Sequence, residues 1–132
     1  MLSLLVVKSL KISIYDDNKS KKFLEQVDRN YDTVYFNEEL AHDFASWVSG
    51  DSMEPKYQNG SVALIRETGF DYDGAVYAVV WKFQTFIKKV YREKEGLRLV
   101  SINKDYKDIY IPYDENPRIV GKIVGDFMPL EV

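Results

Sequence analysis

The 132-residue chain contains no cysteine and only one histidine, His42. The first absence excludes disulfides and thiolate metal sites, and the second leaves a single imidazole for a metal or for a serine–histidine triad. His42 lies in the polar stretch at residues 38–43, where a histidine is more often a surface residue than a catalytic one. The composition therefore predicts no metal site and no cofactor.

The chain also lacks a long hydrophobic run and an excess of basic residues. The apolar start at residues 1–7 is closed by Lys8 and Lys11, whereas a membrane-spanning helix needs about 20 apolar residues. It has no secretory-signal pattern, so we expect an exposed or edge strand there, and a cytoplasmic protein without membrane contact. The net charge of −3 predicts that this chain alone binds DNA poorly.

What the chain does contain is a series of short runs rich in Val, Ile, Tyr and Phe, separated by Asn59-Gly60, Asp73-Gly74 and Glu95-Gly96. Dipeptides that end in glycine, at such intervals, are typical of β-hairpin turns. The pattern therefore predicts a mainly β, largely antiparallel domain with at most short helices. We place the compact domain at residues 31–132, after a flanking segment at residues 1–30 that includes a short helix at 20–29. The strands are expected at residues 10–14, 45–48, 61–66, 75–81, 85–91, 97–102, 109–111 and 118–124.

A candidate nucleophile lies in the string Gly-Asp-Ser-Met-Glu-Pro at residues 50–55. Gly50 permits tight backbone geometry, and a serine just after a strand can point its hydroxyl into a groove that backbone N–H groups also face. Acyl transfer with an oxyanion hole requires this arrangement. From local chemistry alone the commoner interpretation is that Asp51 or Ser52 caps a helical turn, with Glu54 in its first turn.

A serine nucleophile needs a base, and a lysine serves only when its amine is neutral. The ordinary lysine pKa of ~10.4 leaves about 0.04% neutral at pH 7, so the pKa must fall by roughly three units. The run Phe-Ile-Lys-Lys-Val-Tyr at residues 86–91 offers apolar surroundings that would lower it. Strand alternation puts Lys88 on the face of Phe86 and Val90 and Lys89 on the other face, and it does not choose between the two lysines.

Together these strings resemble the LexA, UmuD and phage-repressor family of serine peptidases. The resemblance covers about residues 31–132 and rests on four strings in the family order: Val-Ser-Gly-Asp-Ser-Met-Glu-Pro at 48–55, Asn-Gly-Ser-Val at 59–62, Asp-Gly at 73–74 and Phe-Ile-Lys-Lys-Val at 86–90. It implies a coiled β-sheet like that of LexA and the signal peptidases, with Ser52 as the nucleophile and Lys88 as the general base. It further implies an oxyanion hole of the Asp51 and Ser52 backbone N–H groups, and a substrate groove shaped by Met53 and Pro55.

The resemblance also implies a biological role. The chain would be the self-cleaving C-terminal domain of a transcriptional repressor, linked to the SOS response and stimulated by a RecA filament. It would form a homodimer through its C-terminal strand region, where residues 118–127 alternate as a pairing strand would, although a plain core strand fits that pattern equally. DNA would be bound only through a separate helix-turn-helix domain.

Two features of that family are missing from the sequence. No helix-turn-helix pattern precedes the domain, and no Ala-Gly dipeptide, the usual scissile bond, occurs, since Gly74-Ala75 has the reverse order. A cleavage product, a truncated chain and a prophage relic all fit these departures. Two alternative functions also stay open, namely a dimerisation or partner-binding module that does not cut and a UmuD-like polymerase accessory protein. A signal peptidase would share the chemistry but normally needs a membrane anchor.

Overall fold

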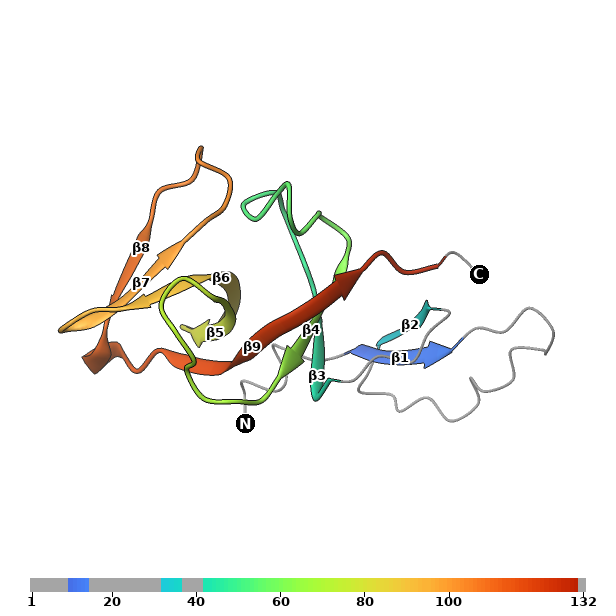
Figure 1. The fold of residues 1–132 in the computed structure, drawn as a ribbon, viewed down its shortest axis with the longest axis horizontal. Helices are drawn as coiled ribbons and strands as arrows, with labels where there is room; N and C mark the ends of the chain where they lie inside the picture. The colour runs from blue at the N-terminus through green and yellow to red at the C-terminus, as the bar shows by residue number, and fades with distance from the viewer. Residues whose placement is uncertain (1–9, 15–31, 37–41, 131–132) are drawn as a thin grey trace.

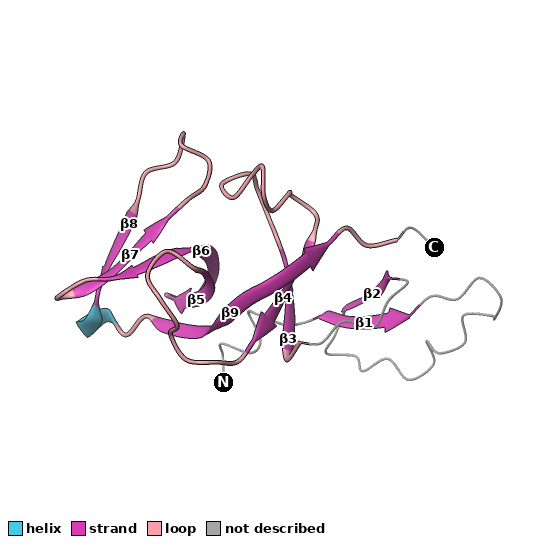
Figure 2. Cartoon of the chain, in the orientation of Figure 1, coloured by secondary structure: helices cyan, strands magenta, loops and turns pink. Residues whose placement is uncertain are grey.

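Strands dominate the computed structural model, which describes residues 10–14, 32–36 and 42–130 (Figure 2). Seven strands form one sheet in the order β3-β4-β9-β5-β6-β7-β8, and all its neighbouring pairs are antiparallel. The sheet curls, with the long β9 crossing its middle (Figure 1). In these ranges the helical element is a 3-10 turn, η2, at Tyr113–Glu115, and no helix is long and apolar enough to cross a bilayer. The expected mainly β, coiled architecture is confirmed.

Every strand expected for the large sheet is present. Its members are β3 (Phe44–Trp47), β4 (Val62–Arg66), β5 (Val76–Trp81), β6 (Gln84–Arg92), β7 (Gly96–Val100), β8 (Ile109–Pro112) and β9 (Arg118–Phe127). The largest departures are at two ends: β7 stops at Val100 instead of residue 102, and β9 continues to Phe127. Pairing between strands sets the end of β9, because Phe127 is the residue that pairs with Val62 at the start of β4.

A second, two-stranded sheet lies outside the first. The expected strand β1 (Leu10–Ile14) pairs with β2 (Asp32–Phe36), which the sequence pattern did not indicate. The two strands are parallel. A parallel pair is not joined by a hairpin turn, so the sequence contains no turn signal that would predict the pairing. The strand expected at residues 1–7 and the helix expected at residues 20–29 lie outside the described residues, and the domain boundary near Tyr31 stays a prediction.

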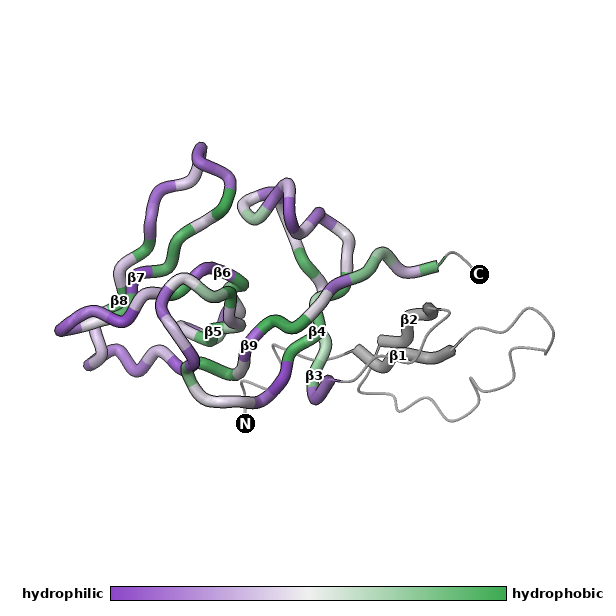
Figure 3. The backbone as a smooth tube through the Cα atoms, viewed as in Figure 1, coloured by the Kyte–Doolittle hydropathy of each residue, from purple (hydrophilic) through white to green (hydrophobic). Residues whose placement is uncertain are grey.

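The core consists of two clusters of buried side chains. The first includes Val48, Met53, Tyr57, Ala63, Ile65, Ala78, Val120 and Ile123. The second includes Ala75, Tyr77, Val79, Val90, Leu97, Leu99 and Ile111. Hydrophobic residues follow β4, β9 and the inner parts of β5 to β7, whereas the hairpin tips are hydrophilic (Figure 3). Since Met53 and Tyr57 belong to the first cluster, the loop after β3 is anchored directly in the core.

Two of the three turn glycines adopt a backbone conformation that favours glycine. Gly60 and Gly74 have φ angles of +89° and +90°, which side-chain-bearing residues rarely adopt. Gly96 instead opens β7, where a side chain would collide with the backbone of β8. The β5–β6 hairpin turns at Lys82 and Phe83, whose positive φ angles of 53° and 62° replace the glycine that such two-residue turns usually carry.

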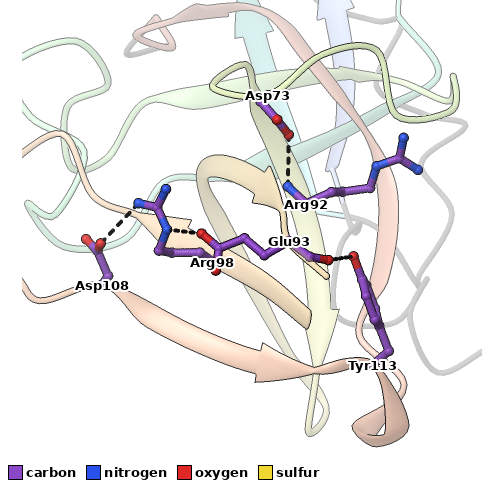
Figure 4. A network of polar contacts seen from close by, with 6 residues as sticks. All are labelled: Asp73, Arg92, Glu93, Arg98, Asp108 and Tyr113. Atoms are coloured by element: carbon purple, nitrogen blue, oxygen red, sulfur yellow. Dashed lines mark hydrogen bonds and ion pairs between the residues drawn. The ribbon is translucent and has the colours of Figure 1, made fainter. Parts of the chain in front are cut away.

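Polar contacts join the outer ends of β6, β7 and β8 (Figure 4). The Arg98 guanidinium lies 2.6 Å from the Glu93 carboxylate and 3.3 Å from that of Asp108. The Tyr113 hydroxyl donates a hydrogen bond of 2.8 Å to the Glu93 carbonyl. Exposed ion pairs contribute little stability. Their structural consequence is to tie down Asp108, where the β7–β8 loop enters β8.

Gly121 offers a direct test of how tightly β9 is packed between its neighbours. A Cβ atom there would lie 2.4 Å from the Arg66 carbonyl oxygen and 2.8 Å from the Ile65 Cγ2. We expect Gly121→Ala to lower the free energy of unfolding by about 1–3 kcal/mol in urea denaturation, because the sheet must shift to admit the methyl group. Gly125→Ala in the same strand is the control, since its Cβ would meet only the Leu64 Cδ1 at 3.4 Å. Equal losses in the two variants would contradict the packing argument.

Candidate active site

The loop at residues 48–61 brings the candidate nucleophile out of β3 and returns the chain to β4. Its base is closed by backbone hydrogen bonds from Val48 N to Ser61 O (2.9 Å) and from Gly60 N to Val48 O (2.8 Å). Higher in the loop, the Asn59 side-chain oxygen accepts a hydrogen bond from Gly50 N at 2.7 Å. The Asn59-Gly60 pair therefore closes the loop that carries Ser52 as well as turning the chain.

Ser52 begins a helical turn whose underside is buried. Glu54 N donates to Asp51 O at 3.1 Å and Tyr57 N donates to Met53 O at 2.9 Å, and the Met53 side chain is only 2% exposed. Met53 thus anchors the turn from beneath, while Pro55 lies at the surface. That these two residues shape a substrate groove stays a prediction. Both side chains have partners outside the turn, because Ser52 contacts Lys88 of β6 and Asp51 contacts Tyr106, between β7 and β8.

Lys88 lies in the middle of β6 and points its amine at Ser52. Its Nζ donates a hydrogen bond to the Ser52 Oγ at 2.5 Å, and the residue is 8% exposed. Lys89 is only partly buried, so the structure makes the choice that alternation left open, with Lys88 facing inward beside buried Val90. Burial lowers the pKa of Lys88 below its ordinary value of 10.5. The structure thus brings together the two side chains that the sequence singled out.

A second loop, at residues 101–108 between β7 and β8, holds the serine loop from the side. Asn103 N donates to Ser52 O at 2.9 Å, and Asn103 Nδ2 donates to Asp51 O at 3.2 Å. The Tyr106 hydroxyl donates to the Asp51 carboxylate at 2.5 Å, and the Tyr106 ring centroid lies 5.8 Å from the Lys88 Nζ. The two loops rise side by side from the same end of the sheet in Figure 1.

Sequence reasoning missed both Asn103 and Tyr106. They lie in Ser-Ile-Asn-Lys-Asp-Tyr-Lys-Asp, a polar stretch with the composition of an ordinary surface loop. The one local hint of a functional residue is a tyrosine among charged residues in the loop that follows β7. Their function depends on contacts with residues about fifty positions earlier in the chain, which no local pattern specifies.

Chemically, the arrangement can activate a hydroxyl. A neutral amine at 2.5 Å from the Ser52 oxygen can accept its proton, and the lowered pKa of Lys88 increases the neutral fraction. His42 lies just before β3. Among the described residues, no group of three or more His, Asp or Glu side chains is arranged to hold a metal ion.

Comparison with known proteins finds a family and several relatives. The family model for Peptidase S24-like proteins matches residues 12–124. The LexA repressor of Clostridium perfringens strain SM101 is 32% identical over 101 residues, covering 76% of this chain and 46% of the repressor. The LexA repressor of Clostridium botulinum strain Hall is 32% identical over 79 residues (59% and 38%), and LexA repressor 1 of Geobacter sulfurreducens is 30% identical over 86 residues (64% and 43%). The chain spans less than half the length of these curated relatives.

The buried amine predicts a stability cost that substitution can reveal. We expect Lys88→Met to raise the free energy of unfolding at neutral pH by about 1 kcal/mol, because an apolar side chain of similar length removes the desolvation of the amine. The unfolded chain binds the lysine proton more readily than the folded chain does. The gain should therefore shrink as the pH rises from the lowered pKa of Lys88 toward 10.5, where the unfolded amine is neutral as well.

Denaturant unfolding at several pH values measures this effect. Lys89→Met is the matched control, since it makes the same chemical change at the less buried neighbour. A Lys88→Met protein that is less stable than the parent at pH 7, or a gain that grows with pH, would show that the amine is not held at a desolvation cost.

Proposed function

Since the chain belongs to the Peptidase S24-like family, we propose that it is the peptidase domain of a LexA-like repressor, in which Ser52 attacks a peptide bond and Lys88 is the general base. The observation that carries this proposal is the distance of 2.5 Å between the Lys88 Nζ and the Ser52 Oγ at a buried position. A lysine in solvent would be charged at neutral pH and could not accept a proton. Burial and contact together therefore support a Ser/Lys dyad.

The proposed reaction has two acyl-transfer steps. Neutral Lys88 takes the Ser52 proton while the Oγ forms a bond to the substrate carbonyl carbon. The carbon–nitrogen bond then breaks, and the leaving amine receives the proton from Lys88. Water then attacks the ester while Lys88 accepts one of its protons, and Lys88 passes that proton to the Ser52 Oγ as the carbon–oxygen bond breaks. This restores the serine and releases the product acid, which loses its proton to solvent as a carboxylate.

The oxyanion would be stabilised by the backbone N–H groups of Asp51 and Ser52. The Asp51 carbonyl accepts hydrogen bonds from Glu54 N and Asn103 Nδ2. Because a trans peptide unit holds its C=O and N–H in opposite directions, fixing this carbonyl also fixes the direction of the Ser52 N–H. A donor with a fixed direction costs no reorganisation when negative charge develops on the substrate oxygen.

The substrate we propose is a peptide segment of a repressor, in the same chain or in a partner copy. The family resemblance adds a RecA filament as the activator, linked to the SOS response, and a separate domain as the DNA-binding part. Such an activator would act by favouring the conformation in which the cleaved segment is docked, and it need not supply catalytic groups.

Dimerisation is the second part of the proposal, and exposed apolar side chains at the C-terminal end of β9 support it. Residues 122–127 of β9 pair with β4, and residues 118–122 pair with β5. Val124 in β9 is exposed, and so are Met128 and Leu130, which follow the strand. Apolar side chains gathered at the surface in this way suit contact with a second copy.

Cleavage in trans tests the dyad. We expect the protein to cut a full-length LexA-like repressor whose own serine, corresponding to Ser52, has been replaced by alanine. Ser52→Ala should lower the rate by about 10⁴-fold or more, and Lys88→Met by at least about 100-fold, because one loses the nucleophile and the other the base. Gel electrophoresis with sequencing of the new terminus gives the rate and the bond cut.

Lys89→Met should leave this rate unchanged, which separates the base from a general effect of positive charge on β6. Full activity of the Lys88→Met protein would contradict the assignment of the base. A protein that cuts nothing but still forms dimers would favour the alternative of a non-cleaving interaction module.

Sedimentation velocity over a range of concentrations tests the dimer. We expect Val124→Lys to weaken the dimer at least about tenfold, a change of about 1.4 kcal/mol, because it places a charge among the exposed apolar side chains of the proposed interface. Phe83→Lys is the control, since Phe83 is equally apolar and more exposed but lies at the β5–β6 turn. If Phe83→Lys dissociates the dimer and Val124→Lys does not, the interface lies elsewhere.

A further inference from the structure

Asp51 presents a difficulty for the proposed dyad. It immediately precedes Ser52, so its carboxylate belongs to the residue next to the hydroxyl that Lys88 contacts. A carboxylate within about 4–6 Å of a lysine favours the charged amine and raises its pKa by 1–3 units. A charged Lys88 could not take the Ser52 proton. The structure must therefore keep this carboxylate occupied elsewhere.

Tyr106 is the residue that occupies it. The Tyr106 hydroxyl donates to the Asp51 Oδ1 at 2.5 Å, within the short range typical of a hydroxyl bound to a charged carboxylate. The face of the same ring is presented to the Lys88 Nζ, 5.8 Å from the centroid. Tyr106 thus contacts the acid with its hydroxyl end and the amine with its ring.

We infer that Tyr106 is a positioning residue, whose hydroxyl holds the Asp51 carboxylate away from the Lys88 amine and so leaves that amine free to accept the Ser52 proton. This inference rests on the proposed dyad. It assigns to Tyr106 no contact with the substrate and no proton transfer.

The other charged groups near the site do not take over this role. Three carboxylates surround Tyr106, namely those of Asp51, Glu54 and Asp105, and together they raise its pKa, with the hydrogen bond to Asp51 as the largest cause. Tyr106 therefore keeps its proton and goes on donating at neutral pH. Glu54 accepts a hydrogen bond from the backbone N of Asn59 at 3.2 Å, so it too is engaged away from the amine.

The strands beside Lys88 add no acid. Tyr77 of β5 lies opposite Lys88, and its hydroxyl accepts hydrogen bonds from the backbone N–H groups of Asp71 and Tyr72. Lys89, next in β6, supplies no negative charge. Burial lowers the pKa of Lys88. A carboxylate released near the amine would act in the opposite direction.

A double-substitution cycle tests the inference on the full chain. Tyr106→Phe retains the ring and removes only the hydroxyl, so the freed Asp51 carboxylate should raise the pKa of the Lys88 amine by about one unit or more. The ¹³Cε signal of Lys88, assigned by its loss in the Lys88→Met protein, reports this pKa in an NMR titration. The low-pH limb of the cleavage profile should move upward by the same amount, since activity requires the neutral amine.

Asp51→Asn in the Tyr106→Phe background should return both the pKa and the pH profile to the parent values, because no charge is left to release. Tyr110→Phe, at an exposed tyrosine on β8, is the control and should change neither. An unchanged Lys88 pKa in Tyr106→Phe would overturn the inference, and so would a shift that Asp51→Asn does not reverse. If the parent cuts no substrate at any pH, the proposed function fails, and the NMR titration still decides the role of Tyr106.

Discussion

The burial of one amine is the constraint on which the rest of this structure depends. Lys88 is 8% exposed in the middle of β6, and its nitrogen lies 2.5 Å from a serine oxygen. Removing an ammonium group from water is unfavourable, so the group gives up its proton more readily, and in the proposed dyad that loss lets it act as the base. The surrounding strands supply the necessary desolvation. The site is therefore a consequence of the core, because weaker packing around β6 would return the amine to solvent and to its charged form.

Two loops that are distant in sequence place polar groups around this buried amine. The serine loop at residues 48–61 is anchored in the core through Met53, and the loop at residues 101–108 reaches across to it through Asn103. The Asn103 side chain fixes the Asp51 carbonyl, which orients the Ser52 N–H of the same peptide unit. The direction of one of the two proposed oxyanion donors is thus set before any substrate arrives.

The sequence predicts the strands well and the loop contacts poorly, for physical reasons. Alternation of apolar side chains and glycine turns identified every strand of the large sheet, because both signals are local. Alternation could not choose between Lys88 and Lys89, since the two faces of β6 are both partly apolar, and only the neighbouring strands decide which face is buried. The sequence pattern could not single out Tyr106, because its partner Asp51 lies 55 positions earlier in the chain. The parallel pairing of β1 with β2 escaped notice because no turn joins the two strands.

A lysine base reverses the electrostatic requirement of a histidine base. In a serine–histidine–aspartate triad the carboxylate stabilises the imidazolium that forms, so an acid beside the base is an advantage. A buried amine starts from the opposite condition, because any nearby carboxylate would stabilise the charged form that cannot accept a proton. The acidic residues near Ser52 would then have to be hydrogen-bonded by donors other than the amine. In this chain the hydroxyl of Tyr106 donates to Asp51, and the backbone N–H of Asn59 donates to Glu54. These polar contacts thus support the proposed base together with the apolar residues that bury it.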